Sequence, residues 1–305
     1  MVNPSPLEGE GQVAAFGDQG EGSWGQRPLT LARKGAPVPL PQGEREAPHV
    51  LGILNLTPDS FSDGGRFASL DYAVAAAHAM IAAGAAMVDI GGESTRPGAT
   101  FVSEAEELAR VGPVLDALGG AVPFSIDTRR AVVMRRALDA GAAMVNDVSA
   151  LTHDPAALAL IAERRCTVVL MHMQGAPQSM QAAPAYVDVV AEVHDWLARR
   201  IDVCVAGGID PGKIVIDPGI GFGKTLDHNL ALLRGLSRFA TLAPVMLGAS
   251  RKALIGKLSG AEVADRLPGS LALALHGAAG GCAWVRVHDV PETVQALRVW
   301  QAVRA

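Results

Sequence analysis

From residue 50 onward, short apolar runs alternate with longer Ala- and Leu-rich segments whose apolar residues recur at helical spacing. Apolar runs of four or five residues indicate buried strands, and the longer segments indicate helices with one buried face. One example is the segment from Val190 to Cys204, in which apolar residues repeat every three or four positions. We predict eight strands, at 50–54, 86–90, 122–126, 142–146, 167–171, 213–217, 244–248 and 283–287. Regular strand–helix alternation predicts a parallel sheet.

A short sequence is nearly duplicated, as AGAAMVDIGG at 83–92 and as AGAAMVNDVS at 140–149. In each copy, and once more near the C-terminus, a glycine precedes a polar residue by five positions: Gly84 and Asp89, Gly141 and Asn146, Gly281 and Arg286. We interpret the pattern as a helix ended by a left-handed glycine, a short buried strand, and a polar residue near the carboxyl end of that strand. This arrangement predicts that polar side chains collect at one end of the sheet.

The fold class predicted from this pattern is α/β, a single-domain (β/α)8 TIM barrel over residues 49–305. Eight strand–helix units in roughly 255 residues agree with the usual barrel length of about 250 residues. A doubly wound open sheet is the alternative, although no Gly-rich dinucleotide fingerprint follows the first strand. Residues 1–48 are predicted to be an N-terminal extension, largely disordered at 1–28, because they are rich in Gly, Pro, Gln and Glu.

Composition excludes several classes of protein. The hydrophobic content of 49% in 305 residues is sufficient for a packed core. The net charge of −5 provides no global positive field, so we expect no nucleic-acid partner. Two windows, 72–88 and 267–285, are apolar enough to resemble membrane spans. Each contains Gly and one His, so we expect no membrane span.

Cysteine usage and the N-terminus bear on the cellular compartment. The three cysteines are widely spaced and form neither a zinc pattern nor a disulfide framework. The first 48 residues lack the features of a signal peptide. We therefore expect a cytoplasmic protein in a reducing environment.

Polar residues stand at the predicted carboxyl ends of the strands, which in a barrel form the rim that carries the chemistry. They are Asn55, Asp89, Asp127, Asn146, His172, Asp217, Lys252, Arg286 and His288. Each has a structural interpretation: Asp127 as a helix cap, Asp217 as the start of a turn, and His172 as a packed histidine. Together they require a polar ligand to satisfy them, and Asp and Asn side chains suit a flat heterocycle with several N–H groups.

A cationic cluster follows the last two predicted strands, with Ser250-Arg251-Lys252 after the seventh and Arg286-Val287-His288 after the eighth. Loops at these positions commonly hold phosphate, so the cluster predicts a phosphorylated ligand, with a surface ion-pair network as the alternative. No metal-binding motif is present. Mg²⁺ that arrives with substrate phosphates needs only one or two protein oxygens, and Asn55 is our candidate metal ligand.

Three loops have unusual composition or length. The loop DPGIGFGK at 217–224 lacks the spacing of a phosphate loop, and we interpret Phe222 as an aromatic wall of the site. The segments 56–69 and 91–103 are longer than ordinary βα loops. Such length predicts that both act as lids.

Eight blocks in order resemble the signature set of the dihydropteroate synthase family. They are NLTPDSFSDGG (55–65), GGESTRPGA (91–99), SIDT (125–128), NDVSA (146–150), LMHMQG (170–175), DPGIGFGK (217–224), SRK (250–252) and RVHDV (286–290). The resemblance implies condensation of 6-hydroxymethyl-7,8-dihydropterin diphosphate with 4-aminobenzoate, giving 7,8-dihydropteroate and diphosphate for folate synthesis. It also implies Mg²⁺ as cofactor and a homodimer. Departures from the family pattern are mild: Leu56, Ile220 and Ala249.

The resemblance assigns roles by matching position. The pterin-binding residues are Asp127, Asn146, Asp217, Phe222 and Lys252, of which Asp127 and Lys252 are the expected catalytic residues. Diphosphate with Mg²⁺ is expected at Asn55, Arg286 and His288. The 4-aminobenzoate pocket is expected at Thr95, Arg96, Pro97 and Ser250.

Two other functions remain open from the sequence. One is a pterin-binding methyltransferase barrel, which shares the Asp and Asn pterin ligands but has no use for the cationic cluster. The other is a non-catalytic pterin-binding paralogue with a regulatory role. Product formation distinguishes both from a synthase.

Overall fold

The computed structural model describes residues 47–56, 66–95, 102–175 and 180–304, with side chains from residue 70 onward in the second range. All of them belong to one compact unit, Ala32–Ala305. The predicted N-terminal disorder at 1–28 and most of the predicted extension at 1–48 lie outside the described residues. In the described part of the chain, no helix is both long and apolar enough to cross a membrane.

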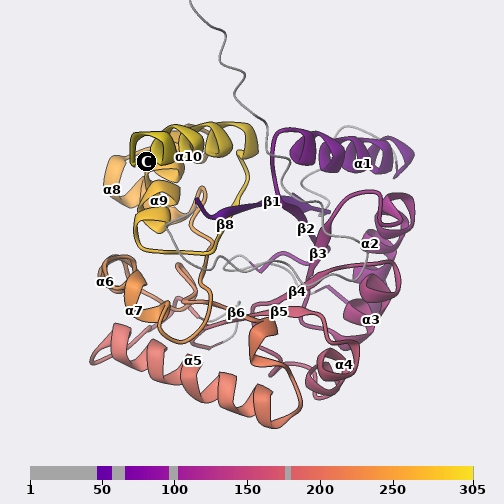
Figure 1. Ribbon diagram of the computed structural model, residues 1–305, viewed down its shortest axis with the longest axis horizontal. Helices are drawn as coiled ribbons and strands as arrows, with labels where there is room; N and C mark the ends of the chain where they lie inside the picture. Colours follow the sequence, from indigo (N-terminus) through magenta and orange to yellow (C-terminus); the bar gives the residue numbers. More distant parts are fainter. Residues whose placement is uncertain (1–46, 57–65, 96–101, 176–179, 305) are drawn as a thin grey trace, which may run out of the picture. The chain divides into compact units, whose positions relative to one another are not determined.

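The strands form one parallel sheet that closes almost completely into a barrel (Figure 1). The described residues contain eight of them: β1 (His49–Asn55), β2 (Met87–Gly91), β3 (Phe124–Asp127), β4 (Met144–Asp147), β5 (Thr167–Met171), β6 (Ile214–Asp217), β7 (Met246–Leu247) and β8 (Trp284–Val287). Their order is β6-β5-β4-β3-β2-β1-β8-β7. A parallel bridge from Ile216 to Val245 joins the two ends of this order. The predicted barrel is confirmed, and the doubly wound alternative is wrong.

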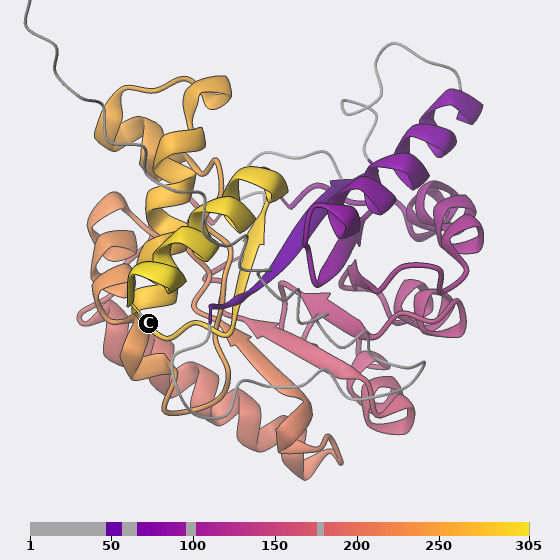
Figure 2. The same cartoon turned by 45° about the horizontal axis from the view of Figure 1, so that its top comes forward.

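Helices surround the strands, as the second view also shows (Figure 2). In the described residues they are α1 (Arg66–Ala82), α2 (Glu104–Leu118), α3 (Ala131–Asp139), α4 (Ala157–Arg164), α5 (Val189–Ala206), α6 (Leu226–Arg234), α7 (Leu236–Phe239), α8 (Ala253–Ser259), α9 (Leu267–Ala279) and α10 (Val290–Arg304). The periodic segment from Val190 to Cys204 lies within α5, as predicted. Two helices instead of one follow each of β6 and β7.

The glycines of the repeated motif have left-handed backbone conformations. The φ angles are +106° at Gly84, +101° at Gly141 and +82° at Gly281. These values favour glycine, because a side chain is strained in this region. Each glycine is the second residue after the end of a helix and lies in the short connection to the next strand, as the sequence predicts.

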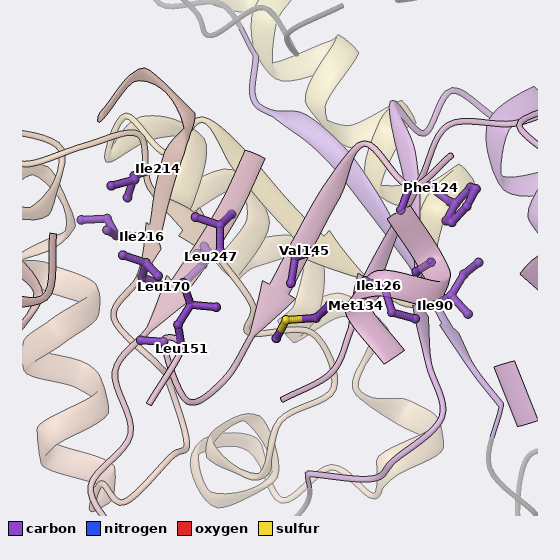
Figure 3. Close-up of a cluster of buried hydrophobic side chains, with 14 of the residues drawn as sticks. Ile90, Phe124, Ile126, Met134, Val145, Leu151, Leu170, Ile214, Ile216 and Leu247 are labelled. Atoms are coloured by element: carbon purple, nitrogen blue, oxygen red, sulfur yellow. The ribbon is translucent and has the colours of Figure 1, made fainter. Parts of the chain in front are cut away.

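Successive side chains of a strand point to opposite faces of the sheet, so the barrel has two separate apolar layers. Outward side chains pack against the helices, and Figure 3 shows part of this layer, including Ile90, Ile126, Val145 and Leu170. Inward side chains at the amino ends of the strands form an apolar floor: Leu51, Met87, Met144, Val169, Val215, Met246 and Trp284.

Two positions further along a strand, the side chain points inward again. Above the floor residues Met87, Met144, Val215 and Trp284, the next inward residues are therefore Asp89, Asn146, Asp217 and Arg286. The fold thus stacks a polar layer directly on an apolar floor, at the carboxyl end of the barrel.

Candidate active site

Asp89 is the centre of the polar layer. Its side chain is fully buried, and it accepts hydrogen bonds from Ser125 Oγ at 2.6 Å and Asn146 Nδ2 at 3.0 Å. Arg286 Nε also donates to it, at 2.6 Å. One carboxylate therefore orients residues from β3, β4 and β8. Asp89 is on the predicted rim, but the resemblance assigns it no role, so its importance emerges only from the structure.

Asp127 forms an ion pair rather than a helix cap. Arg286 Nη2 donates to Asp127 Oδ2 at 2.7 Å, while the first amide of α3, at Ala131, donates to Asp154 instead. Burial raises the pKa of Asp127 to about 7; Arg286 opposes this shift and Asp89 adds to it. The interpretation of Asp127 as a cap is wrong, and the residue is a carboxyl group that titrates near neutral pH.

Asn146 and Asp147 have separate roles. Asn146 points to Asp89, whereas Asp147 accepts hydrogen bonds from the Ser149 amide at 2.7 Å and from the Leu151 amide at 2.8 Å. Asp147 therefore stabilises the turn after β4. Of these two residues, Asn146 is the one whose side chain faces the barrel mouth.

Asp217 stabilises a turn with one carboxylate oxygen and faces the site with the other. Its Oδ1 accepts a hydrogen bond from the Gly219 amide at 2.7 Å, so the turn interpretation is confirmed. Its Oδ2 lies 3.4 Å from where a Cβ of Gly248 would be. Burial raises the pKa of Asp217, and the nearby Lys252 opposes that shift. The carboxyl group thus faces the end of β7 with a cation close by.

Lys252 lies over the aromatic ring of Phe222. The Nζ atom is 4.4 Å from the ring centroid and donates to the Ile220 carbonyl. Loss of water around the ammonium lowers the pKa of Lys252 to about 8, and Asp217 opposes that shift. The structure therefore brings Asp217, Phe222 and Lys252 together, from loops that are well separated in sequence.

Lys224 is a buried cation that sequence reasoning missed. Only 3% of the residue is exposed, and Nζ lies 3.0 Å from His172 Nδ1 and 2.9 Å from the Phe222 carbonyl oxygen. Burial lowers the pKa of Lys224 to about 7 and that of His172 to about 3. His172 also packs edge-on against Trp196. These contacts support the packed-histidine interpretation, and Lys224 holds the loop that carries Phe222.

The predicted cationic cluster divides into two parts. Ser250 Oγ accepts a hydrogen bond from the His288 amide at 3.2 Å and lies 3.1 Å from His288 Nδ1. Arg251 instead pairs with Asp289 at 3.0 Å and is exposed. The ion-pair alternative therefore holds for Arg251, while Ser250 and His288 meet at the ends of β7 and β8.

Asn55 and Asp127 flank Gly91 at the barrel mouth. A Cβ at Gly91 would lie 3.5 Å from Asp127 Cβ and 3.7 Å from Asn55 Oδ1. Thr95 is half-buried and ends a described segment. The predicted aminobenzoate residues Arg96 and Pro97 lie outside the described residues, as do 57–65 and 96–101 of the two predicted lids.

The chain is similar to proteins that bind pterins. Residues 51–288 match the family described as pterin binding enzyme. The chain is 50% identical over 258 residues to a dihydropteroate synthase of Escherichia coli K12, a match that covers 84% of this chain and 91% of that protein. It is 49% identical over 267 residues to a dihydropteroate synthase of Neisseria meningitidis serogroup B, covering 85% and 93%.

Solved structures show the same similarity. A Xanthomonas albilineans dihydropteroate synthase with 4-aminobenzoic acid aligns with a TM-score of 0.80 at 50% identity, covering 86% of this chain and 94% of that one. The enzyme from the same organism in complex with 7,8-dihydropteroate aligns with a TM-score of 0.77 at 47% identity, covering 86% and 96%.

Proposed function

Because the chain belongs to the dihydropteroate synthase family, we propose that it condenses 6-hydroxymethyl-7,8-dihydropterin diphosphate with 4-aminobenzoate. The products are 7,8-dihydropteroate and diphosphate, a transferase reaction of folate biosynthesis. The observation that carries this proposal is the group of polar side chains at the barrel mouth: Asp127, Asn146 and Asp217 come from the ends of β3, β4 and β6, and Lys252 comes from the loop after β7. Relatives whose structures contain 4-aminobenzoic acid and dihydropteroate support it.

The pterin ring is proposed to bind between the carboxyl groups and Lys252. Asp127 and Asp217 accept hydrogen bonds from ring and amino N–H groups, and the Asn146 amide both donates and accepts. Phe222, whose ring lies under Lys252 Nζ, provides an aromatic wall beside the pterin ring. Such a buried polar site rejects flat analogues that lack matching hydrogen-bonding groups.

The diphosphate is proposed to bind at Asn55, Arg286 and His288. Arg286 is held by Asp89 at 2.6 Å and Asp127 at 2.7 Å, so its guanidinium is oriented before substrate binds. His288 is held in turn by Ser250 at 3.1 Å. These contacts provide a rigid anion-binding end of the site.

The described residues fit a Mg²⁺ ion that arrives with the diphosphate. In the described part of the chain, no group of three or more His, Cys, Asp or Glu residues is arranged to hold a metal alone. Mg²⁺ needs only one or two protein oxygens when phosphates supply others, and Asn55 Oδ1 beside Asp127 is a suitable hard ligand. Bound Mg²⁺ would neutralise charge that develops on the leaving diphosphate.

The chemistry we propose begins with cleavage of the C–O bond, whose electron pair leaves with the diphosphate. Arg286 and His288 stabilise the departing charge, and the Asp127 carboxylate stabilises positive charge that develops on the pterin. The arylamine nitrogen then forms the C–N bond and releases a proton to solvent water. Attack by a weak nucleophile depends on positioning, so no general base is assigned. Lys252 binds the polar edge of the pterin ring during both steps.

The acceptor is proposed to bind near Thr95, Arg96, Pro97 and Ser250. Ser250 lies beside His288, so the acceptor pocket would adjoin the diphosphate end of the site. This placement brings the arylamine close to the carbon that loses diphosphate, which is the proximity the reaction needs.

Assembly as a homodimer and residence in the cytoplasm are also part of the proposal. The free cysteines in the described residues, Cys166, Cys204 and Cys282, agree with a reducing compartment. Sedimentation analysis of the purified protein would test the dimer.

The decisive experiment measures diphosphate release by the purified protein with the dihydropterin diphosphate and Mg²⁺, with 4-aminobenzoate present or absent. Release coupled to dihydropteroate formation would establish the proposed function. Pterin binding without coupled product would overturn it, and a corrinoid methyl-transfer assay would then separate a methyltransferase from a non-catalytic paralogue.

A further inference from the structure

A buried ion network lies beside the active site, between the ends of β2 and β3 and helix α2. Arg130 reaches both oxygens of Glu93 at 3.3 Å and donates to the Glu107 carboxylate and the Val102 carbonyl. The side chain of Arg130 is 7% exposed, that of Glu93 6% and that of Glu107 0%. We call Arg130 with Glu93, Val102 and Glu107 the Arg130 clamp.

The clamp holds two segments that are separated along the chain. Glu93 lies two residues before Thr95, in the stretch that follows β2, and Val102 lies two residues before the start of α2. One guanidinium therefore contacts both segments, and Glu107 extends the contact into α2. Burial lowers the pKa of Arg130, but Glu107 and Glu93 outweigh that effect and raise it overall, so the clamp keeps its positive charge.

Other contacts fix the same stretch after β2. Arg129 Nη2 donates to Glu93 at 2.9 Å, and Arg110 Nη1 donates to the Gly92 carbonyl at 2.8 Å. A Cβ at Gly92 would lie only 2.8 Å from Val111 Cγ1, so the chain packs directly on α2. Such close packing and paired charges define one position for the chain that leads to Thr95.

The clamp is also tied to the reacting end of the site. Arg129 and Arg130 follow Asp127 by two and three residues, on the strand end that carries this carboxyl group. Buried contacts therefore tie Glu93, two residues before Thr95, to the chain that directly follows Asp127. We infer that Arg130 is a positioning residue for 4-aminobenzoate. Arg130 fixes the positions of Glu93 and Thr95 relative to Asp127.

This inference rests on the proposed function, because its readout is the kinetics of the acceptor substrate. A buried ion pair often adds little net stability, whereas removal of one partner leaves an unpaired charge. In Arg130→Met, the buried Glu107 loses the cation it pairs with, and Glu93 keeps only its contact with Arg129. Displacement of Thr95 by as little as 1 Å would impair acceptor positioning substantially.

The test compares steady-state kinetics of Arg130→Met and Arg130→Lys with those of the unmodified protein. We expect the KM for 4-aminobenzoate to rise about tenfold or more in Arg130→Met. The KM for the dihydropterin diphosphate should stay within about twofold, and Arg130→Lys should recover only part of the loss, since an ammonium lacks the bidentate fork. Faster amide exchange of residues 92–95 should accompany the kinetic change.

Arg136→Met is the matched control, because Arg136 also joins α3 to α2, through Asp116, but on the exposed side. It should leave both KM values unchanged. If Arg130→Met does not fold, Glu107→Gln and Arg130→Lys serve in its place. An equal rise of both KM values, or a lower melting temperature with unchanged kinetics, would overturn the inference. Absence of synthase activity in the unmodified protein would instead overturn the proposed function.

Discussion

Arg286 Nη2 and Asp127 Oδ2 are paired at 2.7 Å across the barrel mouth, although 159 residues separate them in the chain. The same guanidinium donates to Asp89 at 2.6 Å, so one cation is shared between two carboxylates. The two bonds fix the orientation of the guanidinium, and burial raises the pKa of Asp127 to about 7 although Arg286 opposes that shift. The site that we propose for the dihydropterin diphosphate therefore contains a carboxyl group with a pKa near neutral pH.

Replacement of Arg286 by methionine should weaken diphosphate binding and raise the pKa of Asp127 further. We expect the KM for the dihydropterin diphosphate to rise roughly 10- to 100-fold, which corresponds to loss of a hydrogen bond to a charged group. Steady-state kinetics would measure it. Arg251→Met is the control, since Arg251 pairs with Asp289 at the surface and should behave like the unmodified protein. Equal behaviour of the two variants would contradict the assignment.

Stability should fall as pH rises through the titration of Asp127. The folded pKa of about 7 is above the ordinary value of 3.8, so the folded state retains a proton that the unfolded chain releases. The stabilising effect is therefore fully present below about pH 4 and is lost as pH approaches 7. Asp127→Asn should reduce this pH dependence, as measured by denaturant titrations between pH 4 and 8. An unchanged slope would show that Asp127 is ionised at lower pH.

Pterin binding should depend on the charge of Lys252. Its pKa of about 8 predicts that affinity declines as pH rises through 8, because the ammonium loses its proton. Lys252→Met should weaken binding roughly 10- to 100-fold at pH 7 and abolish this pH step. Calorimetric titration with a pterin would test both effects. Lys257→Met, at an exposed position of α8, the helix that follows Lys252, should change neither.

The loop after β6 should require glycine at position 219 for space as well as for conformation. Gly219 has φ +71°, and an added Cβ would lie 1.9 Å from the His172 carbonyl oxygen. Gly260 has φ +74° with nothing within 4 Å. Gly260→Ala should therefore cost about 1–2 kcal/mol of stability from backbone strain alone. Gly219→Ala should cost clearly more and weaken pterin binding, and equal unfolding free energies would refute the steric argument.

Removal of Mg²⁺ should abolish product formation, and added Mg²⁺ should restore it. Asn55→Ala should raise the Mg²⁺ concentration needed for half-maximal activity, because the proposed protein ligand is lost. Asn55→Asp retains an oxygen ligand and should require less Mg²⁺ than Asn55→Ala. Activity that persists in a chelator would show that the reaction proceeds without the metal.

Deletion of residues 1–28 should leave the melting temperature and the synthase rate within about twofold of the full chain. The prediction follows from the composition of this segment, which offers too few apolar residues for a core. The family match begins only at residue 51. Insoluble or inactive truncated protein would contradict it.

The sequence by itself determined the barrel and the members of its rim. Buried apolar residues recur with different periods in strands and in helices, so the sequence alone predicts the order of the elements. The spacing from Gly84 to Asp89 and from Gly141 to Asn146 placed polar residues at strand ends, because a left-handed glycine sets where the next strand starts. The ordered motifs then indicated the family.

Only the tertiary structure decided how these residues are paired. Asp89 and Arg286 are 197 residues apart, and their contact depends on β8 lying next to β1 and β1 next to β2. The pairing of Lys224 with His172 and the Arg130 clamp likewise depend on which loops face each other. Local patterns carry no information on such contacts, because side-chain reach, burial and the resulting pKa shifts arise only when distant segments are packed together.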